Sequence, residues 1–219
     1  MAATVVIQCA ASKEGGYLRG PDGVQVGFVA QPERAMPKPG WLFAHPDDHS
    51  SSGECWRDVL SAYNDRWLQN GHDPDHLRPA WQLYTNRAFS SLVQAFGQEN
   101  VYVLSAGWGL VRAAYLLPNY DITFSSQADA VSVRRPADAY DDFEQMAVDI
   151  AGPVHFLGGR SYLPLFCRLT DHVNAERIVY YNSMHLPVAP GCRLVRFRTT
   201  TRTNWHYECA HRLIADRVV

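Results

Sequence analysis

Three ionisable residues of the sequence have side chains suited to chemistry. Asp121, which follows Asn119 and Tyr120, carries a carboxylate that could orient a water molecule or stabilise a developing positive charge. Lys13 is one of only two lysines in the chain, and its amine could bind phosphate or attack a carbonyl carbon. His185 could place positive charge beside a group that leaves as an anion.

Each of these residues also has a purely structural interpretation. Asp121 could cap a turn or pair with an arginine, Lys13 could be a surface lysine, and His185 could be a polar loop residue. Residues 45–49 (HPDDH) resemble metal ligands, but without a matching cluster nearby we expect a solvated acidic loop and no metal site. We expect Cys9 to be a buried thiol at the end of a strand.

These residues stand near the ends of predicted strands. Short apolar runs predict strands at 4–9, 101–105, 154–157, 177–181 and 193–197. Apolar residues at helical spacing predict helices at 88–96, 140–150, 162–169 and 205–218. This alternation predicts a three-layer α/β/α domain with a central, mainly parallel sheet of four to five strands. Because ligands of such sheets bind beyond the carboxyl ends of the strands, the loops after the first four strands should share a pocket.

One long segment, approximately residues 15–79, interrupts this alternation. It is rich in Gly, Pro, Asp, His and Ser and contains one amphipathic stretch, 55–68. We interpret it as an insertion after the first strand, partly loop and partly helix, within a single α/β domain that covers residues 1–219. A loop of this length in a compact domain is usually functional or mobile.

Composition restricts the class of protein. The chain has 219 residues, a net charge of −2 and 47% hydrophobic residues, enough for a core without disulfide support. Its five cysteines form no CxxC pair, which argues against a disulfide framework or a zinc finger. No apolar run is long enough for a membrane span, and no signal-type segment is present. We expect a cytoplasmic monomer that needs no cofactor and binds no membrane.

Positive charge gathers near the end of the chain. Residues 193–217 hold six arginines, among them Arg198 and Arg202, against two acidic residues. Aromatic residues are interleaved with these arginines, as in surfaces that bind nucleic acids. The stretch is either a footprint for phosphate or a solvated basic edge.

Four segments together resemble a bacterial and phage protein family: 7–13 (IQCAASK), 83–89 (LYTNRAF), 104–111 (LSAGWGLV) and 119–121 (NYD). A related arrangement occurs in the core domain of archaeosine-synthase-type tRNA-modifying proteins, which resembles the uracil-DNA glycosylase fold. The pattern is also similar to anti-phage DNA glycosylases that excise glucosylated hydroxymethylcytosine. The resemblance implies a uracil-DNA glycosylase-like fold, with double-stranded, modified phage DNA as the partner.

A base in DNA must leave the helix before its glycosidic bond can be cleaved, and this requirement assigns roles to the candidate residues. Asp121 would position water and stabilise an oxocarbenium-like state, His185 would supply charge to the leaving base, and Lys13 would hold a flanking phosphate. The expected base-binding residues are Gln8, Ser12, Ser105, Trp108, Asn119, Tyr120, Tyr162 and Asn182. The expected DNA phosphate-binding residues are Arg160, Arg198 and Arg202.

Two other functions use the same residues. The first is an N-glycosidase or base-exchange transferase that acts on a free nucleoside or nucleotide, or that modifies a tRNA base. The second is a nucleic-acid-binding module without catalytic activity. A DNA-binding protein should lose affinity steeply as salt rises, because binding releases counterions, whereas an enzyme for free nucleosides should not.

Overall fold

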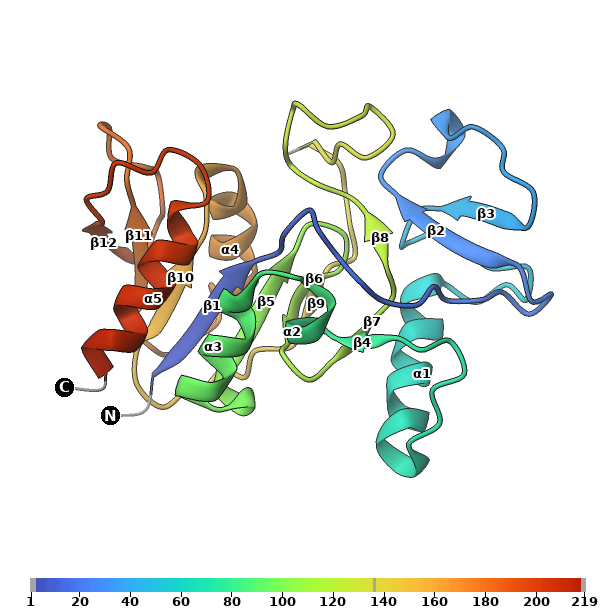
Figure 1. The fold of residues 1–219 in the computed structure, drawn as a ribbon, viewed down its shortest axis with the longest axis horizontal. Helices are drawn as coiled ribbons and strands as arrows, with labels where there is room; N and C mark the ends of the chain where they lie inside the picture. Colours follow the sequence, from blue (N-terminus) through green and yellow to red (C-terminus); the bar gives the residue numbers. More distant parts are fainter. Residues whose placement is uncertain (1–2, 136, 218–219) are drawn as a thin grey trace.

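A seven-stranded sheet forms the centre of the molecule in the computed structural model, which describes residues 3–135 and 137–217 (Figure 1). Five strands run parallel: β1 (Thr4–Gln8), β5 (Val101–Ser105), β10 (Val154–Leu157), β11 (Arg177–Tyr181) and β12 (Cys192–Arg196). The others are β6 (Gly109–Arg112), antiparallel to β5, and β9 (Phe143–Glu144), parallel to β6. The order is β12–β11–β10–β1–β5–β6–β9, so the first strand has a parallel neighbour on each side.

The structure has a strand at each of the five positions predicted from apolar runs. In β1, Val5, Val6 and Ile7 are all fully buried, as expected for a strand covered on both faces. The predicted number of four to five strands is wrong, because β6 and β9 also join the sheet. β6 follows β5 through a short turn and β9 has only two residues, so neither produces a separate apolar run.

Helices cover both faces of the sheet. α3 (Arg87–Phe96) and α5 (Trp205–Arg217) lie together on one face, and α4 (Leu163–Leu169) lies on the other (Figure 1). The crossovers β1–α3–β5 and β10–α4–β11 run in opposite directions along the sheet, and right-handed crossovers therefore place their helices on opposite faces. No helix in the described part of the chain is long and apolar enough to span a membrane.

The sequence of α3 explains its limits. The side chain of Asn86 accepts a hydrogen bond from the backbone N–H of Ala88, which caps the first turn. Phe89 and Leu92 on its buried face have no exposed surface, and Gly97 ends the helix at a φ of 83°. The predicted helices at 162–169 and 205–218 are also present as α4 and α5, with residue 218 outside the described residues.

The predicted helix at 140–150 is wrong. The segment is extended, and its middle forms β9. The backbone N–H groups of Phe143 and Gln145 donate to the carbonyls of Trp108 and Leu110, so the strand pairing satisfies groups that a helix would pair internally. Tertiary pairing here outweighs the helical spacing of the apolar residues.

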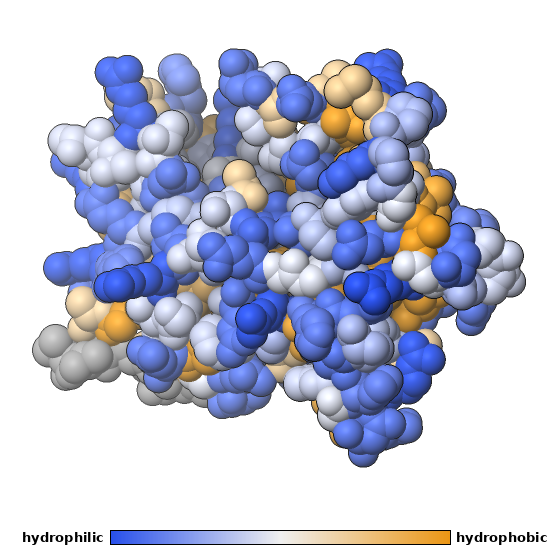
Figure 2. All heavy atoms as spheres, turned by 45° about the vertical axis from the view of Figure 1, so that its right-hand side comes forward, coloured by the Kyte–Doolittle hydropathy of each residue, from blue (hydrophilic) through white to orange (hydrophobic). Residues whose placement is uncertain are grey.

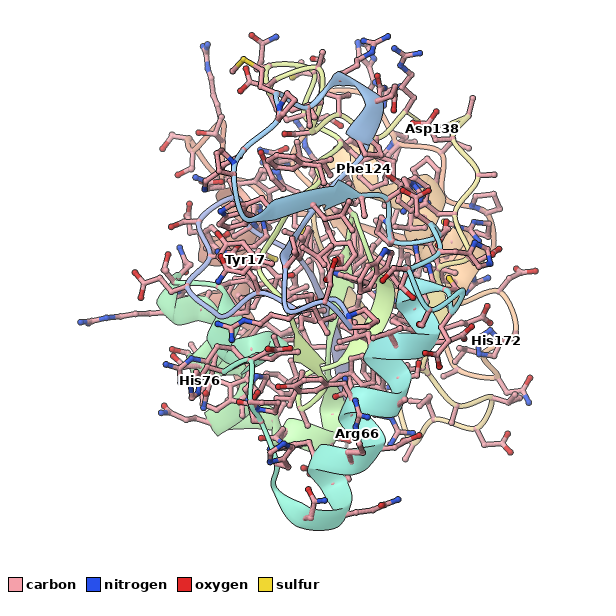
Figure 3. The ribbon with its side chains drawn as sticks, turned by 90° about the vertical axis from the view of Figure 1, so that its right-hand side faces the viewer. Tyr17, Arg66, His76, Phe124, Asp138 and His172 are labelled. Atoms are coloured by element: carbon pink, nitrogen blue, oxygen red, sulfur yellow. The ribbon has the colours of Figure 1, made fainter. Side chains whose placement is uncertain are left out.

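The insertion after the first strand builds a second, smaller sheet beside the main one (Figure 1). This sheet has the order β3–β2–β8 and consists of β2 (Gln25–Val29), β3 (Trp41–Ala44) and β8 (Tyr120–Asp121), all parallel. The predicted amphipathic helix is present as α1 (Trp56–Asn70), seen in front in Figure 3, whereas the strands β2 and β3 were not predicted from the sequence. Phe28 packs edge-on against both Trp56 and Trp108, so both sheets share one hydrophobic core.

Short elements connect these layers. β4 (Arg78–Pro79) pairs antiparallel with β7 (Leu116–Leu117), and this pairing ties the end of the insertion to the chain that leads to β8. The remaining elements are α2 (Ala80–Leu83) and the 3₁₀ turns Pro32–Arg34, Gln98–Asn100 and Arg160–Tyr162.

Candidate functional site

A cavity of about 510 Å³ lies at the carboxyl end of β1, between that strand, the chain after β8 and the start of α5. Four residues predicted from the sequence line it: Gln8, Lys13, Asp121 and Tyr162. We call it the β1 cavity. It lies beyond the carboxyl ends of parallel strands, where ligands of such sheets bind, and its volume lies in the range of ligand pockets.

Lys13 is the basic residue of the β1 cavity. Its Nζ lies 4.3 Å from the ring centroid of Tyr120 and donates to the carbonyl of Ala11 at 3.3 Å. Burial lowers the pKa of the Lys13 amine below its ordinary value, while the nearby Cys9 and Asp121 partly offset this effect. The amine is therefore more easily deprotonated than that of a surface lysine.

Asp121 ends β8 and presents an exposed carboxylate to the β1 cavity. The hydroxyl of Ser132, which is almost fully buried, donates to Asp121 Oδ2 at 2.6 Å. The backbone is fixed as well, because Asp121 pairs with Val29 of β2. A strand and one hydrogen bond thus hold the carboxylate in place.

Gln8 and Cys9 connect neighbouring strand ends. Gln8 Oε1 accepts a hydrogen bond from the N–H of Gly159 at 2.6 Å, which leaves the amide Nε2 as a donor for a ligand. Cys9 is buried, as the sequence predicted, with its Sγ 3.2 Å from the hydroxyl of Tyr162. Burial, with a smaller effect of Cys9, raises the pKa of Tyr162 well above its ordinary value, so the phenol stays protonated.

Two residues predicted to bind a base lie in the core instead. Trp108 has no exposed surface and packs between Phe28 and Phe143, so it cannot stack on a ligand here. Ser105 is equally buried: its hydroxyl donates to the hydroxyl of Tyr120 at 2.8 Å and accepts from the N–H groups of the turn that follows. Neither residue lines the β1 cavity.

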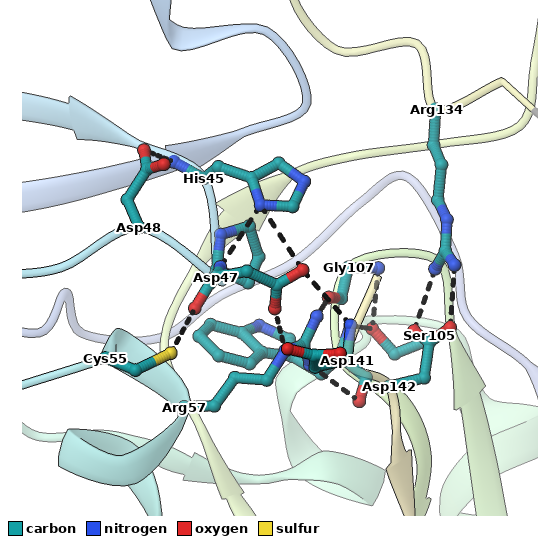
Figure 4. Close-up of polar contacts among 12 residues, drawn as sticks. His45, Asp47, Asp48, Cys55, Arg57, Ser105, Gly107, Arg134, Asp141 and Asp142 are labelled. Carbon is teal, nitrogen blue, oxygen red and sulfur yellow. Dashed lines mark hydrogen bonds and ion pairs between the residues drawn. The ribbon is translucent and has the colours of Figure 1, made fainter. Parts of the chain in front are cut away.

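Two buried arginines donate hydrogen bonds to the backbone of the turn that follows β5, residues 106–108 (Figure 4). Arg57 donates to the carbonyls of Gly107 and Trp108, at 3.0 and 3.3 Å, and Arg134 donates to the carbonyl of Ala106 at 2.8 Å. Arg134 also forms a bidentate ion pair with Asp142, at 2.8 and 2.6 Å. The backbone after β5 is therefore fixed, and its carbonyls are turned toward arginines.

The run 45–49 has a structural role in this cluster. Asp47 forms an ion pair with the buried Arg57 and lies beside the ring of His45, while Asp48 accepts from the N–H of His45 (Figure 4). The expectation of a solvated acidic loop is therefore wrong for Asp47, whose side chain is only 19% exposed. The described residues contain no group of three or more side chains that could hold a metal ion.

A second cavity, also of about 510 Å³, lies on the other side of Asp121. Asn119 and Tyr120 line it together with Tyr17 and Trp41, and Asn119 Nδ2 donates to the hydroxyl of Tyr17 at 3.1 Å. Tyr17 is labelled in Figure 3, and apolar side chains reach the surface in the right-hand half of Figure 2. Four of the eight predicted base-binding residues thus line two cavities that share Asp121: Gln8 and Tyr162 in one, Asn119 and Tyr120 in the other.

The remaining predicted residues lie outside both cavities. Arg160 and Asn182 line a smaller cavity of about 40 Å³ next to β11, and Asn182 Nδ2 donates to the carbonyl of Thr201 at 3.3 Å. His185 is exposed in the loop after β11 and lines none of these cavities, so the structure does not place it near Asp121. Three further residues, all exposed, line none of them: Ser12, Arg198 and Arg202.

Sequence reasoning missed three residues of the site: Ser132, Asn204 and Tyr207. Asn204 and Tyr207 line the β1 cavity from the start of α5, and Ser132 holds Asp121. Only the pairing of distant segments brings them there, and no local pattern marks them. A comparison of the chain with protein-family models, curated proteins and solved structures found no significant match.

Proposed function

We propose that the protein is a DNA N-glycosylase that flips a modified base out of duplex DNA, excises it and leaves an abasic site. The observation that carries the proposal is the β1 cavity, which combines a fixed carboxylate, an amide donor and a basic amine: Asp121, Gln8 and Lys13. Cleavage of an N-glycosidic bond needs a group for the developing positive charge and a group for the leaving base, and this set supplies both.

The identity of the base and the biological role rest on the resemblance of the four segments at 7–13, 83–89, 104–111 and 119–121. It favours a uracil-DNA glycosylase-like fold, glucosylated hydroxymethylcytosine as the base, and a role in defence against phages. The parallel sheet with helices on both faces is compatible with such a fold. A cavity of about 510 Å³ offers room for a base that carries a large substituent.

The mechanism follows from the positions of the groups. The extruded base enters the β1 cavity, where Gln8 donates to its hydrogen-bonding edge. Asp121, held by Ser132, stabilises the oxocarbenium-like sugar and orients the attacking water. Lys13 takes the role first given to His185: its ammonium group protonates the departing base, and the lowered pKa favours this transfer. Exposed Arg198 and Arg202 bind flanking phosphates.

The test uses three DNA duplexes, which contain plain cytosine, hydroxymethylcytosine and its glucosylated form. Alkali cleaves DNA at abasic sites, and we expect cleavage of the glucosylated duplex after incubation with the protein. Asp121→Asn should slow base release by at least about 100-fold, since it removes the charge that the transition state needs. Asp129→Asn, in the exposed loop that leads to Ser132, should leave the rate unchanged. Absence of abasic sites in all three duplexes would contradict the proposal.

A further inference from the structure

Lys13 has the position of a nucleophile as well as that of a proton donor. Its amine lines the β1 cavity together with the carboxylate of Asp121, and the ring of Tyr120 lies under its Nζ at 4.3 Å. The backbone at Lys13 is fixed, because Lys13 forms a β-bridge with Tyr84 and the backbone N–H of Glu14 donates to the carbonyl of Leu83. The amine is therefore held in the cavity by both its backbone and its contacts.

The surroundings of the amine favour its reactive, neutral form. Burial lowers the pKa of Lys13, and loss of its proton to the leaving base would produce the neutral amine at the moment of bond cleavage. The other lysine, Lys38, is exposed and rests on the ring of Trp41 at 3.7 Å, in the second cavity. The two lysines thus differ in exposure and in location, and they provide a matched pair for a test.

We propose that Lys13 attacks C1′ of the abasic sugar, so that the protein also cleaves the DNA strand as an abasic-site lyase. This inference rests on the proposed glycosylase function, because base release supplies the abasic sugar. The amine adds to the aldehyde of the ring-opened sugar, and after proton transfers the former carbonyl oxygen leaves as water, which produces an iminium ion. A base removes a proton from C2′, the C3′–O bond breaks, and the 3′ phosphate departs. Water then hydrolyses the iminium ion and restores the amine.

The groups that these steps need lie around the amine of Lys13. The face of Tyr120 that now lies beneath the ammonium group would stabilise the iminium cation by a cation–π contact. Asp121 is the carboxylate of the cavity, and its fixed position makes it the base for the C2′ proton. The reaction consumes only the abasic sugar and a water molecule that is regenerated, so no oxidant, reductant or metal ion is required.

The experiment treats the full-length protein with a duplex that already contains abasic sites, in the presence of sodium borohydride. Borohydride reduces an iminium ion to a stable amine and so links protein and DNA covalently. We expect a covalent complex with the wild type and with Lys38→Arg, and none with Lys13→Arg. The arginine preserves the positive charge for phosphate binding but is not a nucleophile, which separates the two roles of this residue.

Peptide mapping of the trapped wild-type complex gives a second measurement that does not depend on the folding of a variant. We expect the adduct on Lys13, and an adduct on Lys38 or on the N-terminal amine would overturn the inference. Because preformed abasic sites bypass base release, the two proposals fail separately. Base release without trapping contradicts the lyase and leaves the glycosylase intact. Trapping on Lys13 without release of any base contradicts the glycosylase and supports the lyase.

Discussion

At the scale of single residues, the site depends on how an exposed carboxylate is held still. An aspartate at the surface normally samples several rotamers, and fixing it costs conformational entropy. The buried hydroxyl of Ser132 limits Asp121 through one short hydrogen bond, and β8 limits its backbone. We therefore regard Ser132 as a positioning residue, which acts on the proposed reaction through Asp121 alone.

Ser132→Ala should lower kcat for base release about tenfold and leave KM nearly unchanged. A hydrogen bond to a charged group contributes about 1.5–3 kcal/mol to stability. A loss of about 1.4 kcal/mol of transition-state stabilisation already lowers the rate tenfold. Ser132→Thr keeps the hydroxyl and should restore most of the rate. Ser126→Ala, at an exposed serine that does not line the β1 cavity, is the control and should leave kcat unchanged. Equal losses for alanine and threonine would show that Ser132 acts only through packing.

At the scale of elements, the turn after β5 is fixed by charges that come from both sides. Arg57 reaches it from α1, within the insertion, and Arg134 reaches it from the chain that follows β8. The side chain of Asp142 has no exposed surface, so its charge depends on Arg134 and on the more exposed Arg168. Breaking a buried ion pair on one side leaves an uncompensated charge, which is costly.

Arg134→Met should lower the free energy of unfolding by about 3–5 kcal/mol, because it leaves Asp142 buried without its bidentate partner. The matched control is Arg168→Met, which removes the other arginine from the same carboxylate. The side chain of Arg168 is 55% exposed, and its removal should cost less than about 1 kcal/mol. Urea denaturation of the three proteins measures both changes. Similar losses for the two variants would refute the importance of burial in this cluster.

The helices and strands also show which parts of the fold can be predicted from the sequence. Apolar periodicity correctly predicted the five parallel strands and the helices α1, α3, α4 and α5. Such patterns arise because a helix buries one face and a central strand buries both of its faces. The two-residue strand β8 depends on its pairing with β2, a segment distant in sequence, which no local pattern encodes. The strands β2 and β3 lie inside the segment that was interpreted as partly loop and partly helix, and they were not predicted. Trp108 illustrates the same limit for the site. Its place after a strand suggested a ligand contact, yet aromatic neighbours from the insertion and from β9 enclose it.

At the scale of the whole molecule, buried histidines make stability depend on pH. His206 in α5 is 3% exposed, and burial lowers its pKa to about 4. The unfolded chain, with an ordinary histidine pKa near 6.5, binds more protons than the folded protein between these two values. The contribution of His206 to the free energy of unfolding is therefore fully present above about pH 6.5 and decreases as the pH falls toward 4. Burial shifts the pKa values of His45 and His155 in the same direction.

We expect the free energy of unfolding to decrease by about 2 kcal/mol between pH 7 and pH 5 through His206 alone, since each pKa unit corresponds to about 1.4 kcal/mol. His206→Gln removes the titrating group and should flatten the pH dependence by this amount. His211→Gln, at an exposed position of the same helix, should not alter it. Urea denaturation at several pH values measures the slope, and an unchanged slope in His206→Gln would contradict this origin.

The central position of β1 also determines when the site can exist during synthesis of the chain. β1 is completed by β5 and by β10, which ends at Leu157, and the β1 cavity is closed only by residues such as Tyr207. The segments up to the start of α5 must therefore leave the ribosome before the β1 cavity, which Lys13 and Asp121 line, is formed. Such distant pairings fold slowly, and the first strand stays exposed and without its partners until they arrive. Until then the β1 cavity cannot bind a ligand, and the hydrophobic strand β1 needs protection from aggregation.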